Sequence, residues 1–436
     1  MIEPKKLTLT KSYDYWKRAV EVIPNGCMTI SNGPISYITN VSPIYIQKGK
    51  GCNVWDVDGN KFLDLAPGGY LKILGHNYKP LTKAIIKQVK DDSIFQMPHP
   101  LEVETAETIV KTIPSAEMVK FAKNGADVLT MGVRAARAYT NRDMIASEGY
   151  HGIHDWYIGT TERNKGVPEA VKRLTATFNY NDIDSLKKIF EKYPDQIACV
   201  TLEPVQLSEP KNNFLHQVKK ITHENGAVLM FDEIITGFRF SLAGAQGYFD
   251  IKPDLSAFGK AMSNGFSCSA LVGKSDIMME FEKGAFFSTT YGGETTGLIA
   301  AKKTIEIMKE KNVHDHLWKM GSILKNGINK IIKQNNLQDH YYIHGYPVWT
   351  VIKAKGDDKI GTENEKTGLL QQEAMQRGML AGLFHGLCYA HKEKDIQKGL
   401  EIYEDSFKKV KKYINEGDIK KHLKGEYGGK VFRKVG

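Results

Sequence analysis

The stretch GAVLMFDEIITGF (Gly226–Phe238) begins as an unbroken apolar run and then presents two carboxylates, Asp232 and Glu233. An apolar run of this length is typical of a strand that is buried on both faces of a parallel sheet. Such a strand delivers Asp232 to the end of the sheet, where a carboxylate is costly to desolvate unless it meets a cation or several hydrogen-bond donors. Taken alone, Asp232 has two simpler interpretations, capping of the following turn or metal binding.

A lysine follows the next apolar run, LSAFGK (Leu255–Lys260). Gly259 permits a sharp turn that exposes the side chain of Lys260. A lysine amine condenses with an aldehyde only when it is neutral, and a dry pocket lowers its pKa toward that state. A buried carboxylate and a neutral lysine are what pyridoxal phosphate (PLP) requires, because a carboxylate beside the protonated pyridine nitrogen keeps the ring an electron sink. The alternative for Lys260 alone is an ordinary surface lysine.

A third candidate feature lies at the start of a good helix-forming run, FAKNGADVLTMGVRAARAYT (Phe121–Thr140). Asn124, Gly125 and Ala126 stand between a predicted strand and this helix. Free amides at a helix start bind phosphate, and Gly125 permits close approach. Asp127 suits the helix dipole but would repel a phosphate if its side chain turned inward. The alternative is a plain strand–helix turn.

Two further segments supply aromatic and hydroxyl groups. In SEGYHGIHDW (Ser147–Trp156), Tyr150 follows a strand and is a candidate for stacking on a flat ring. His151 and His154 lack a clear set of metal partners, so we expect no metal site. In FFSTTYGGETTG, a glycine-rich turn before a helix, Thr290 is a candidate phosphate donor.

The order of the apolar runs predicts the architecture. From about Ser115, strand runs alternate with helical segments, which indicates an α/β domain with a largely parallel sheet and sites at the carboxyl ends of its strands. After about Ala301 the chain becomes helical and lysine-rich, and from Tyr341 it mixes short strands with amphipathic helix. We therefore predict an N-terminal segment and part of a small domain at 1–75, a large cofactor-binding domain at 76–310, and a C-terminal small domain at 311–436.

Composition narrows the possible partners and location. The chain has 436 residues, 41% of them hydrophobic, and a formal charge of +10, but its lysines are dispersed through amphipathic segments such as KKTIEIMKEKNV (Lys302–Val313). This pattern favours solvated helix faces over a nucleic-acid surface. No stretch approaches the apolar length of a transmembrane helix, so we expect no membrane association. The cysteines are far apart and form no CxxC motif, which indicates reduced thiols and a cytoplasmic protein: Cys27, Cys52, Cys199, Cys268 and Cys388.

In this order and spacing, the segments resemble class III aminotransferases, PLP enzymes of fold type I that include glutamate-1-semialdehyde 2,1-aminomutase. The resemblance runs from about Gly51 to about Ile396 and rests on VWDVDGNKFLD, LGH, NGAD…VRAARAYT, GYHG, LEPV, LMFDEIITGFR, PDLSAFGKAMSNG, TTYGGE and YAHKEKDI. It implies a large domain with a mainly parallel seven-stranded sheet and a smaller α+β domain built from both termini. It also implies an obligate homodimer with shared active sites.

The resemblance assigns a role to each candidate residue. Lys260 is implied to be the catalytic lysine that forms the Schiff base and shuttles the proton, and Asp232 the partner of the pyridine nitrogen. Tyr150 and Ile234 are implied to cover the two faces of the ring. The remaining cofactor contacts, three to the phosphate and one beside the ring, are implied for Gly125, Ala126, Thr290 of the neighbouring subunit, and Glu203.

Several positions depart from the family pattern. Asn124-Gly125-Ala126 stands where relatives usually have Ser-Gly-Thr, so one phosphate hydroxyl is missing. The aminomutase carries an arginine for the substrate carboxylate in its amino-terminal loop, yet CMTISNGP (Cys27–Pro34) contains none. A pocket tryptophan of the aminomutase aligns with Gly69, and a carboxy-terminal glutamate aligns with Leu383. These changes predict a roomier pocket that is less selective for anionic substrates.

The sequence therefore predicts a PLP-dependent aminotransferase that moves an amino group between an amine donor and an aldehyde or ketone acceptor derived from a sugar or polyol. The donor stays open, because Ser208 stands where ω-amino-acid aminotransferases have a carboxylate and Glu209 is one place away. One alternative is an aminomutase that shuttles nitrogen within one molecule. Another is a catalytically inactive basic binding protein on the same fold, which the +10 charge and the altered Asn124–Ala126 turn favour.

Overall fold

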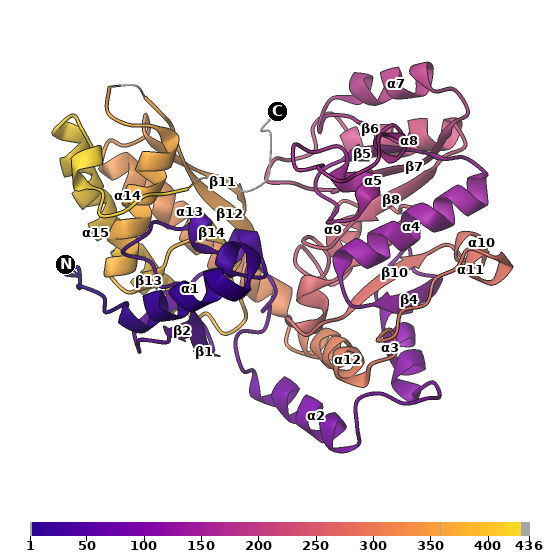
Figure 1. The fold of residues 1–436 in the computed structure, drawn as a ribbon, viewed down its shortest axis with the longest axis horizontal. Helices are drawn as coiled ribbons and strands as arrows, with labels where there is room; N and C mark the ends of the chain where they lie inside the picture. Colours follow the sequence, from indigo (N-terminus) through magenta and orange to yellow (C-terminus); the bar gives the residue numbers. More distant parts are fainter. Residues whose placement is uncertain (1, 358, 429–436) are drawn as a thin grey trace. The chain divides into compact units, whose positions relative to one another are not determined.

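The computed structural model describes residues 2–357 and 359–428 and divides into two compact units (Figure 1). One unit comprises Met1–Tyr78 and Asp315–Val435, and the other comprises Lys79–His314. The unit built from the N-terminal and C-terminal segments is called the terminal unit below, and the other is called the central unit. The chain thus leaves the terminal unit once and returns to it.

The central unit is built on a seven-stranded sheet in the order β4-β10-β9-β8-β7-β5-β6. β10 is antiparallel to both of its neighbours, β4 and β9, and the remaining pairs are parallel. The predicted α/β fold with a mainly parallel seven-stranded sheet is therefore confirmed. The strands are β4 (Met118–Ala122), β5 (Met144–Glu148), β6 (Thr175–Thr177), β7 (Ile197–Leu202), β8 (Val228–Asp232), β9 (Leu255–Phe258) and β10 (Ser269–Gly273).

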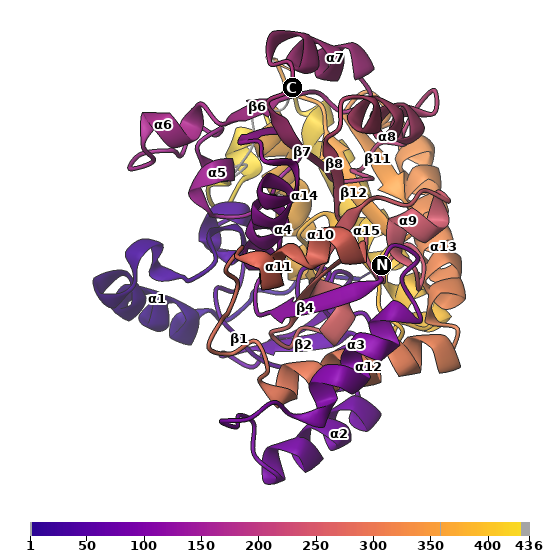
Figure 2. The ribbon, with the colours of Figure 1, turned by 90° about the vertical axis from the view of Figure 1, so that its right-hand side faces the viewer.

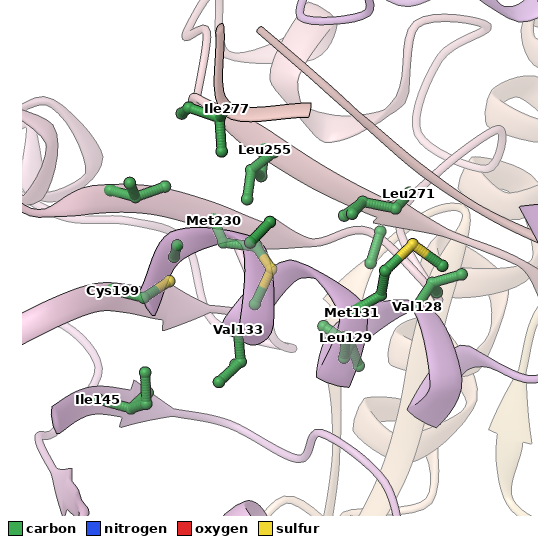
Figure 3. Close-up of a cluster of buried hydrophobic side chains, with 14 of the residues drawn as sticks. Val128, Leu129, Met131, Val133, Ile145, Cys199, Met230, Leu255, Leu271 and Ile277 are labelled. Carbon is green, nitrogen blue, oxygen red and sulfur yellow. The ribbon is translucent and has the colours of Figure 1, made fainter. Parts of the chain in front are cut away.

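Helices cover both faces of this sheet. β8 demonstrates the arrangement, because Val228 and Met230 belong to one buried apolar cluster and Leu229 and Phe231 to another, as the two-residue period of a strand requires. The first cluster packs under α4 (Gly125–Thr140), whose apolar side chains face β7, β8, β9 and β10 (Figure 3). The second cluster includes side chains of α7 (Ile183–Lys192) and α8 (Phe214–Glu224).

Three further helices pack together at one end of the central unit (Figures 1 and 2). They are α2 (Lys79–Lys90), α3 (Pro100–Val110) and α12 (Thr295–Glu310). α12 contacts both of the others, and its first residue, Thr295, donates its backbone N–H to the carbonyl of Ser93 (2.8 Å). Shorter helices complete the unit: α5 (Asp155–Ile158), α6 (Glu169–Lys172), α9 (Gly244–Tyr248), α10 (Ser275–Met278) and α11 (Glu280–Lys283).

The terminal unit contains two small sheets. In β1-β2-β3-β13 the first three strands are antiparallel and β13 runs parallel to β3, while β11-β12-β14 is antiparallel. β2 and β3 form an antiparallel hairpin. The strands are β1 (Ile46–Lys50), β2 (Asn53–Asp56), β3 (Lys61–Asp64), β11 (Tyr341–Tyr346), β12 (Trp349–Ala354), β13 (Met379–Leu380) and β14 (Phe384–His385). Its helices are α1 (Thr10–Val22), most of α13 (Val313–Gln334), α14 (Glu363–Gln376) and α15 (Glu393–Asn415).

The structure also describes the state of the cysteine thiols and the apolar length of the helices. All five cysteines are free thiols. Burial raises the pKa of Cys52 and of Cys268 to about 12, so both stay protonated and unreactive at neutral pH. Within 2–357 and 359–428, no helix is both long and apolar enough to cross a bilayer.

Candidate active site

The predicted site residues of the central unit gather where its parallel strands end. Gly125 and Ala126 follow β4, Tyr150 follows β5, and Glu203 follows β7. Asp232 is the last residue of β8, Ile234 lies two residues beyond it, and Lys260 comes two residues after β9. Parallel strands place their carboxyl ends at one edge of the sheet, so segments far apart in the sequence converge there.

Asp232 is held in a fixed orientation by two donors. Its Oδ2 lies 2.8 Å from His151 Nδ1, and its Oδ1 accepts the backbone N–H of Ile234 (3.0 Å). The other ring nitrogen, His151 Nε2, lies 2.7 Å from the carbonyl oxygen of Glu148. His151 thus bridges the Asp232 carboxylate and the backbone at the end of β5. His151 is fully buried and holds the Asp232 carboxylate through its Oδ2 atom.

Ile234 fills the space between the two turns of the site. A Cβ added at Gly125 would lie 2.9 Å from Ile234 Cδ1, and one added at Gly259 would lie 3.3 Å from the same atom. Glycine at position 125 therefore allows the isoleucine to approach the backbone at the start of α4. The side chain of Ile234 is partly buried and packs against the apolar cluster under α4.

Tyr150 is positioned by a buried carboxylate and by aromatic contacts. Its backbone N–H donates to Glu203 Oε1 (2.9 Å), and Glu203 is only 4% exposed. The Tyr150 ring packs edge-to-face against Tyr157, with ring centroids 5.5 Å apart. Tyr150 is partly buried and packs beside the apolar cluster under α4.

The start of α4 presents backbone amides. Gly125 and Ala126 are the first two residues of this 16-residue helix, and amides there have no acceptor within the helix. The carboxylate of Asp127 turns back to accept the backbone N–H and the side-chain amide of Asn124, each at 3.1 Å, and it also lies 3.3 Å from His154 Nε2. The Asp127 charge is thus partly balanced by these three groups.

Lys260 occupies a strained turn just after β9. Its φ is +40°, an unusual value for a residue with a side chain. Burial lowers the pKa of Lys260 below its ordinary value, the negative charges of Asp232 and Glu203 oppose this effect, and Arg239 reinforces it. The net shift favours the neutral amine, which is the nucleophilic form.

Glu233, the second carboxylate of the opening stretch, has a structural role. It is fully buried and accepts hydrogen bonds from Thr236 Oγ1 (2.7 Å) and from the backbone N–H groups of Ala245 (2.7 Å) and Gln246 (2.8 Å). Burial raises the pKa of Glu233, and these hydrogen bonds oppose the rise. Asp232 caps the following turn through the Ile234 amide and also contacts His151, while Glu233 anchors the later segment at Ala245 and Gln246.

Three further observations complete the comparison with the predicted site. Thr290 lies exposed in the loop before α12. His151 has no role in the sequence-based prediction, and the only available signal was its position directly after Tyr150 at the end of a strand. Within the described parts of the chain, no group of three or more His, Cys, Asp or Glu side chains is arranged to hold a metal ion.

The residues present fit PLP. The amides at the start of α4 can bind a phosphate. The buried carboxylate of Asp232, held by two hydrogen bonds, can pair with a protonated pyridine nitrogen. A lysine whose pKa is lowered by burial suits the aldehyde. Between them, Ile234 and Tyr150 offer apolar surface to an aromatic ring.

Comparison with known proteins identifies the family. The family profile described as aminotransferase class-III matches residues 37–389. The chain is 32% identical over 418 residues to the 3-aminobutyryl-CoA aminotransferase of Cloacimonas acidaminovorans, which covers 94% of this chain and 100% of the relative. It is also 32% identical over 432 residues to the glutamate-1-semialdehyde 2,1-aminomutase of Thermosipho melanesiensis, covering 93% of this chain and 100% of that protein.

Solved structures agree on the fold. An omega-transaminase from Sphaerobacter thermophilus superposes with a TM-score of 0.82 at 24% identity, over 92% of this chain and 97% of that one. A transaminase with PLP bound superposes with a TM-score of 0.85 at 24% identity, over 94% and 99% of the two chains. The chain therefore belongs to the class III aminotransferase family and is a PLP-dependent transaminase.

Proposed function

We propose that this transaminase acts on an aldehyde or ketone acceptor that is derived from a sugar or polyol and carries no carboxylate beside the reacting carbon. The observation that carries the proposal is the arginine-free loop CMTISNGP, since the resemblance to the aminomutase puts a carboxylate-binding arginine there. Two more positions support it. A Cβ added at Gly69 would meet nothing within 4 Å among the described residues, and Leu383 offers a buried apolar side chain in place of a carboxylate.

The chain's own groups would share the work of amino transfer as follows. Bound PLP supplies an electron sink for the pair left when a proton leaves the amine-bearing carbon. Lys260 Nζ, whose pKa is lowered by burial, would accept that proton and return it during transfer. Asp232, fixed by His151 and the Ile234 amide, presents negative charge to the pyridine nitrogen.

Other residues in this proposal orient and shield the reacting groups. Tyr150 and Ile234 cover the two faces of the ring, and Glu203 fixes the Tyr150 backbone beside it. Gly125 and Ala126 bind the phosphate through their amides. The phosphate hydroxyl lost at Ala126 leaves Thr290 of a neighbouring subunit as the hydroxyl donor.

A homodimer is part of the proposal. Apolar side chains are exposed around the Thr290 loop and on the segments that adjoin it, where Met97 is 75% and Phe286 74% exposed. Thr295 at the end of this loop is hydrogen-bonded to Ser93, so the two apolar segments are neighbours. Exposed apolar groups gathered in this way favour burial against a second copy of the chain: Ile94, Phe95, Met97, Val103, Phe286 and Tyr291.

A second candidate acceptor is a 3-oxoacyl thioester. It is favoured by the full-length similarity to a protein named 3-aminobutyryl-CoA aminotransferase. A thioester carbonyl is uncharged, so this substrate also requires no arginine for a carboxylate. An aminomutase reaction is a further alternative, favoured by the similarity to the second relative.

A half-reaction screen tests the proposal. The PLP-loaded protein is mixed separately with polyol-derived amines, a 3-aminoacyl thioester and carboxylated amines, and the loss of the visible cofactor band is followed. We expect the polyol-derived amines to react fastest. A response to the thioester alone would favour the second candidate, and a response to carboxylated amines alone would contradict both.

The aminomutase is separated by a second mixture. The pyridoxamine-phosphate form is incubated with one amino aldehyde and no external acceptor. Conversion of that compound to its isomer would support the aminomutase, and the absence of conversion is the result that our proposal predicts.

A further inference from the structure

An ion pair joins the turn before α4, which holds Asn124 and the proposed phosphate-binding residues Gly125 and Ala126, to the loop that carries Thr290. Lys123 is the residue before Asn124, and its Nζ lies 2.7 Å from Glu294 Oε2. The same Nζ donates to the carbonyl of Ser267 (3.2 Å) and approaches the carbonyl of Glu294 (3.5 Å). The two side chains are 16% and 17% exposed, so solvent screens their attraction only in part.

Glu294 also fixes the beginning of α12. Its carboxylate accepts the backbone N–H of Thr296 (2.8 Å) and of Gly297 (3.1 Å), as well as the hydroxyl of Thr296. Burial would raise the pKa of Glu294, but the hydrogen bonds from Lys123 and Thr296 outweigh this and lower it. Glu294 is therefore held as an anion with a single orientation.

The location of Lys123 requires this partner. A cation near a helix N-terminus meets the positive end of the helix dipole, which is unfavourable without a compensating anion. A Cβ added at Gly297 would lie 3.0 Å from Lys123 Nζ and 2.5 Å from the carbonyl of Ser267, so glycine leaves the space through which the ammonium reaches. The Lys123–Glu294 pair is therefore largely shielded from solvent, unlike the exposed lysine ion pairs elsewhere in the central unit.

The contact joins two segments with different tasks. On one side, Lys123 directly precedes the helix start that we propose for the chain's own cofactor phosphate. On the other side, Glu294 ends the loop with exposed Thr290, which we propose for the phosphate of the neighbouring subunit. Ser267 Oγ, which donates to the Lys123 carbonyl (3.2 Å), and Ser269 Oγ, which donates to the Asn124 carbonyl (2.9 Å), fix the strand side of this junction.

We propose that Lys123 and Glu294 are positioning residues that hold the Thr290 loop in place for the phosphate site of the second subunit. The inference rests on the proposed function, since it requires PLP at Lys260 and a homodimer. Loss of the ion pair would release the Thr290 loop. The PLP affinity that falls as a result would be that of the partner subunit's site. Glu294 thus acts in trans through contacts that it makes within its own chain.

Glu294→Gln is the variant that isolates this role. Glutamine keeps Oε1, which accepts from Thr296, and replaces Oε2, which pairs with Lys123 and accepts the Gly297 amide, by a neutral NH2 group. We expect the PLP dissociation constant of the homodimeric variant to rise roughly tenfold, the effect of losing one charge-assisted hydrogen bond. Glu169→Gln breaks an equally short ion pair, with Lys172 (2.7 Å), on a helix distant in sequence, and we expect no change there.

Mixed dimers provide the decisive measurement. Subunits of Lys260→Ala and Glu294→Gln carry different tags, and their heterodimers are purified. Each heterodimer has one site with an intact Lys260, contributed by the Glu294→Gln subunit, and the loop facing that site comes from the Lys260→Ala subunit. PLP incorporation is measured as the label fixed by borohydride on Lys260 over a range of PLP concentrations, with no turnover required.

The outcomes separate the inference from the function on which it rests. Trapping with wild-type affinity in the heterodimer supports action in trans. Heterodimers as weak as the Glu294→Gln homodimer, or a homodimeric variant with wild-type affinity, would overturn the inference while leaving the proposed function intact. A wild-type protein that traps no PLP at Lys260 would overturn both.

Discussion

Asp232 has two hydrogen-bond donors in the protein itself, His151 and the amide of Ile234. A carboxylate held in this way keeps its orientation without a ligand, which is the preorganisation that electrostatic catalysis uses. Asp232→Asn removes the charge and keeps the shape. We expect kcat/KM to fall by about 10²–10³, while PLP still bonds to Lys260, as measured by steady-state kinetics and by borohydride labelling.

Asp254 supplies the matched control for this variant. It is a buried carboxylate in the same unit that pairs with Lys274 (2.6 Å) and accepts the Leu229 amide (2.8 Å). Asp254→Asn is expected to lower stability and to leave the activity per folded molecule close to that of the wild type. If both variants lost the same share of kcat/KM, the charge of Asp232 would have no special role.

His385, in the terminal unit, makes stability depend on pH. Its ring lies 2.9 Å from Thr350 Oγ1 and 2.8 Å from the Tyr403 hydroxyl, and burial lowers its pKa from 6.5 to about 3. Below pH 6.5 the unfolded chain therefore binds a proton that the folded chain refuses, so stability falls as pH drops from about 6.5 toward 3. From pH 7.5 to 5.5 this group alone is expected to lower the free energy of unfolding by about 1.4 kcal/mol.

His385→Gln tests that contribution. Glutamine hydrogen-bonds to the same hydroxyls and does not titrate, so the variant is expected to lose about 1.4 kcal/mol less between the two pH values. Urea unfolding at pH 7.5 and at pH 5.5 gives the difference for each protein. Equal pH dependence in the wild type and the variant would assign the acid sensitivity to other groups.

At the residue scale, the sequence predicts a site residue when a chemically suitable side chain stands at the end of an apolar run. Asp232 and Lys260 end successive apolar runs, and this pattern alone brings them to one edge of a parallel sheet. The role of His151 could not be predicted from the sequence. Its partners are the Glu148 carbonyl, which the turn after β5 brings close, and the Asp232 carboxylate, which the pairing of distant strands brings close. The anchoring role of Glu233 depends likewise on the fold of a loop twelve residues further along.

Among the elements, the junction of α4 with the turn after β8 depends on close packing. Gly125→Ala places a methyl group 2.9 Å from Ile234 Cδ1, so the isoleucine must move toward the proposed ring position. We expect PLP affinity to fall roughly tenfold, the cost of about 1.4 kcal/mol of overpacking. PLP titration followed by absorbance measures the change.

Ile234→Val provides the second half of a double-mutant cycle. Valine lacks Cδ1, the atom closest to the added methyl, so the double variant is expected to recover most of the affinity that Gly125→Ala loses. Additive losses in the double variant would show that the two residues do not act through this contact.

The strands from β7 to β10 were predictable and one helix of the terminal unit was not. Each strand from β7 to β10 is a short apolar run that is buried on both faces, and such runs have few alternatives. α14 has the sequence ENEKTGLLQQEAMQ, which has no clear apolar stripe, yet Lys366, Gln372 and Glu373 are buried in it. Lys366 and Gln372 donate to carbonyls outside the helix, those of Lys355 (2.8 Å) and His422 (2.9 Å), and Glu373 pairs with Arg377 at the helix end. Sequence periodicity does not report such hydrogen-bond partners.

For the whole molecule, the proposed assembly predicts a concentration-dependent loss of activity when the exposed apolar surface is charged. Phe286→Asp introduces a carboxylate at the proposed interface, where burying an unpaired charge is costly. We expect monomers in sedimentation velocity and a PLP affinity that is reduced roughly tenfold or more, since each site would lose the partner's Thr290.

Ile323→Asp is the control for the assembly prediction. Ile323 is an exposed apolar residue on α13 in the terminal unit, so its replacement is expected to leave the sedimentation coefficient unchanged. A Phe286→Asp protein that sediments with the wild type would contradict the placement of the interface.

The central claim, that Lys260 is the residue that bonds to PLP in a transaminase site, has a direct measurement. The purified chain is loaded with PLP, reduced with borohydride and digested, and the labelled peptide is identified by mass spectrometry. The account predicts a visible absorbance band that borohydride removes and a single label on Lys260 in the peptide that contains LSAFGK. A protein that takes up no PLP, or a label on another lysine with Lys260 unmodified, would contradict it.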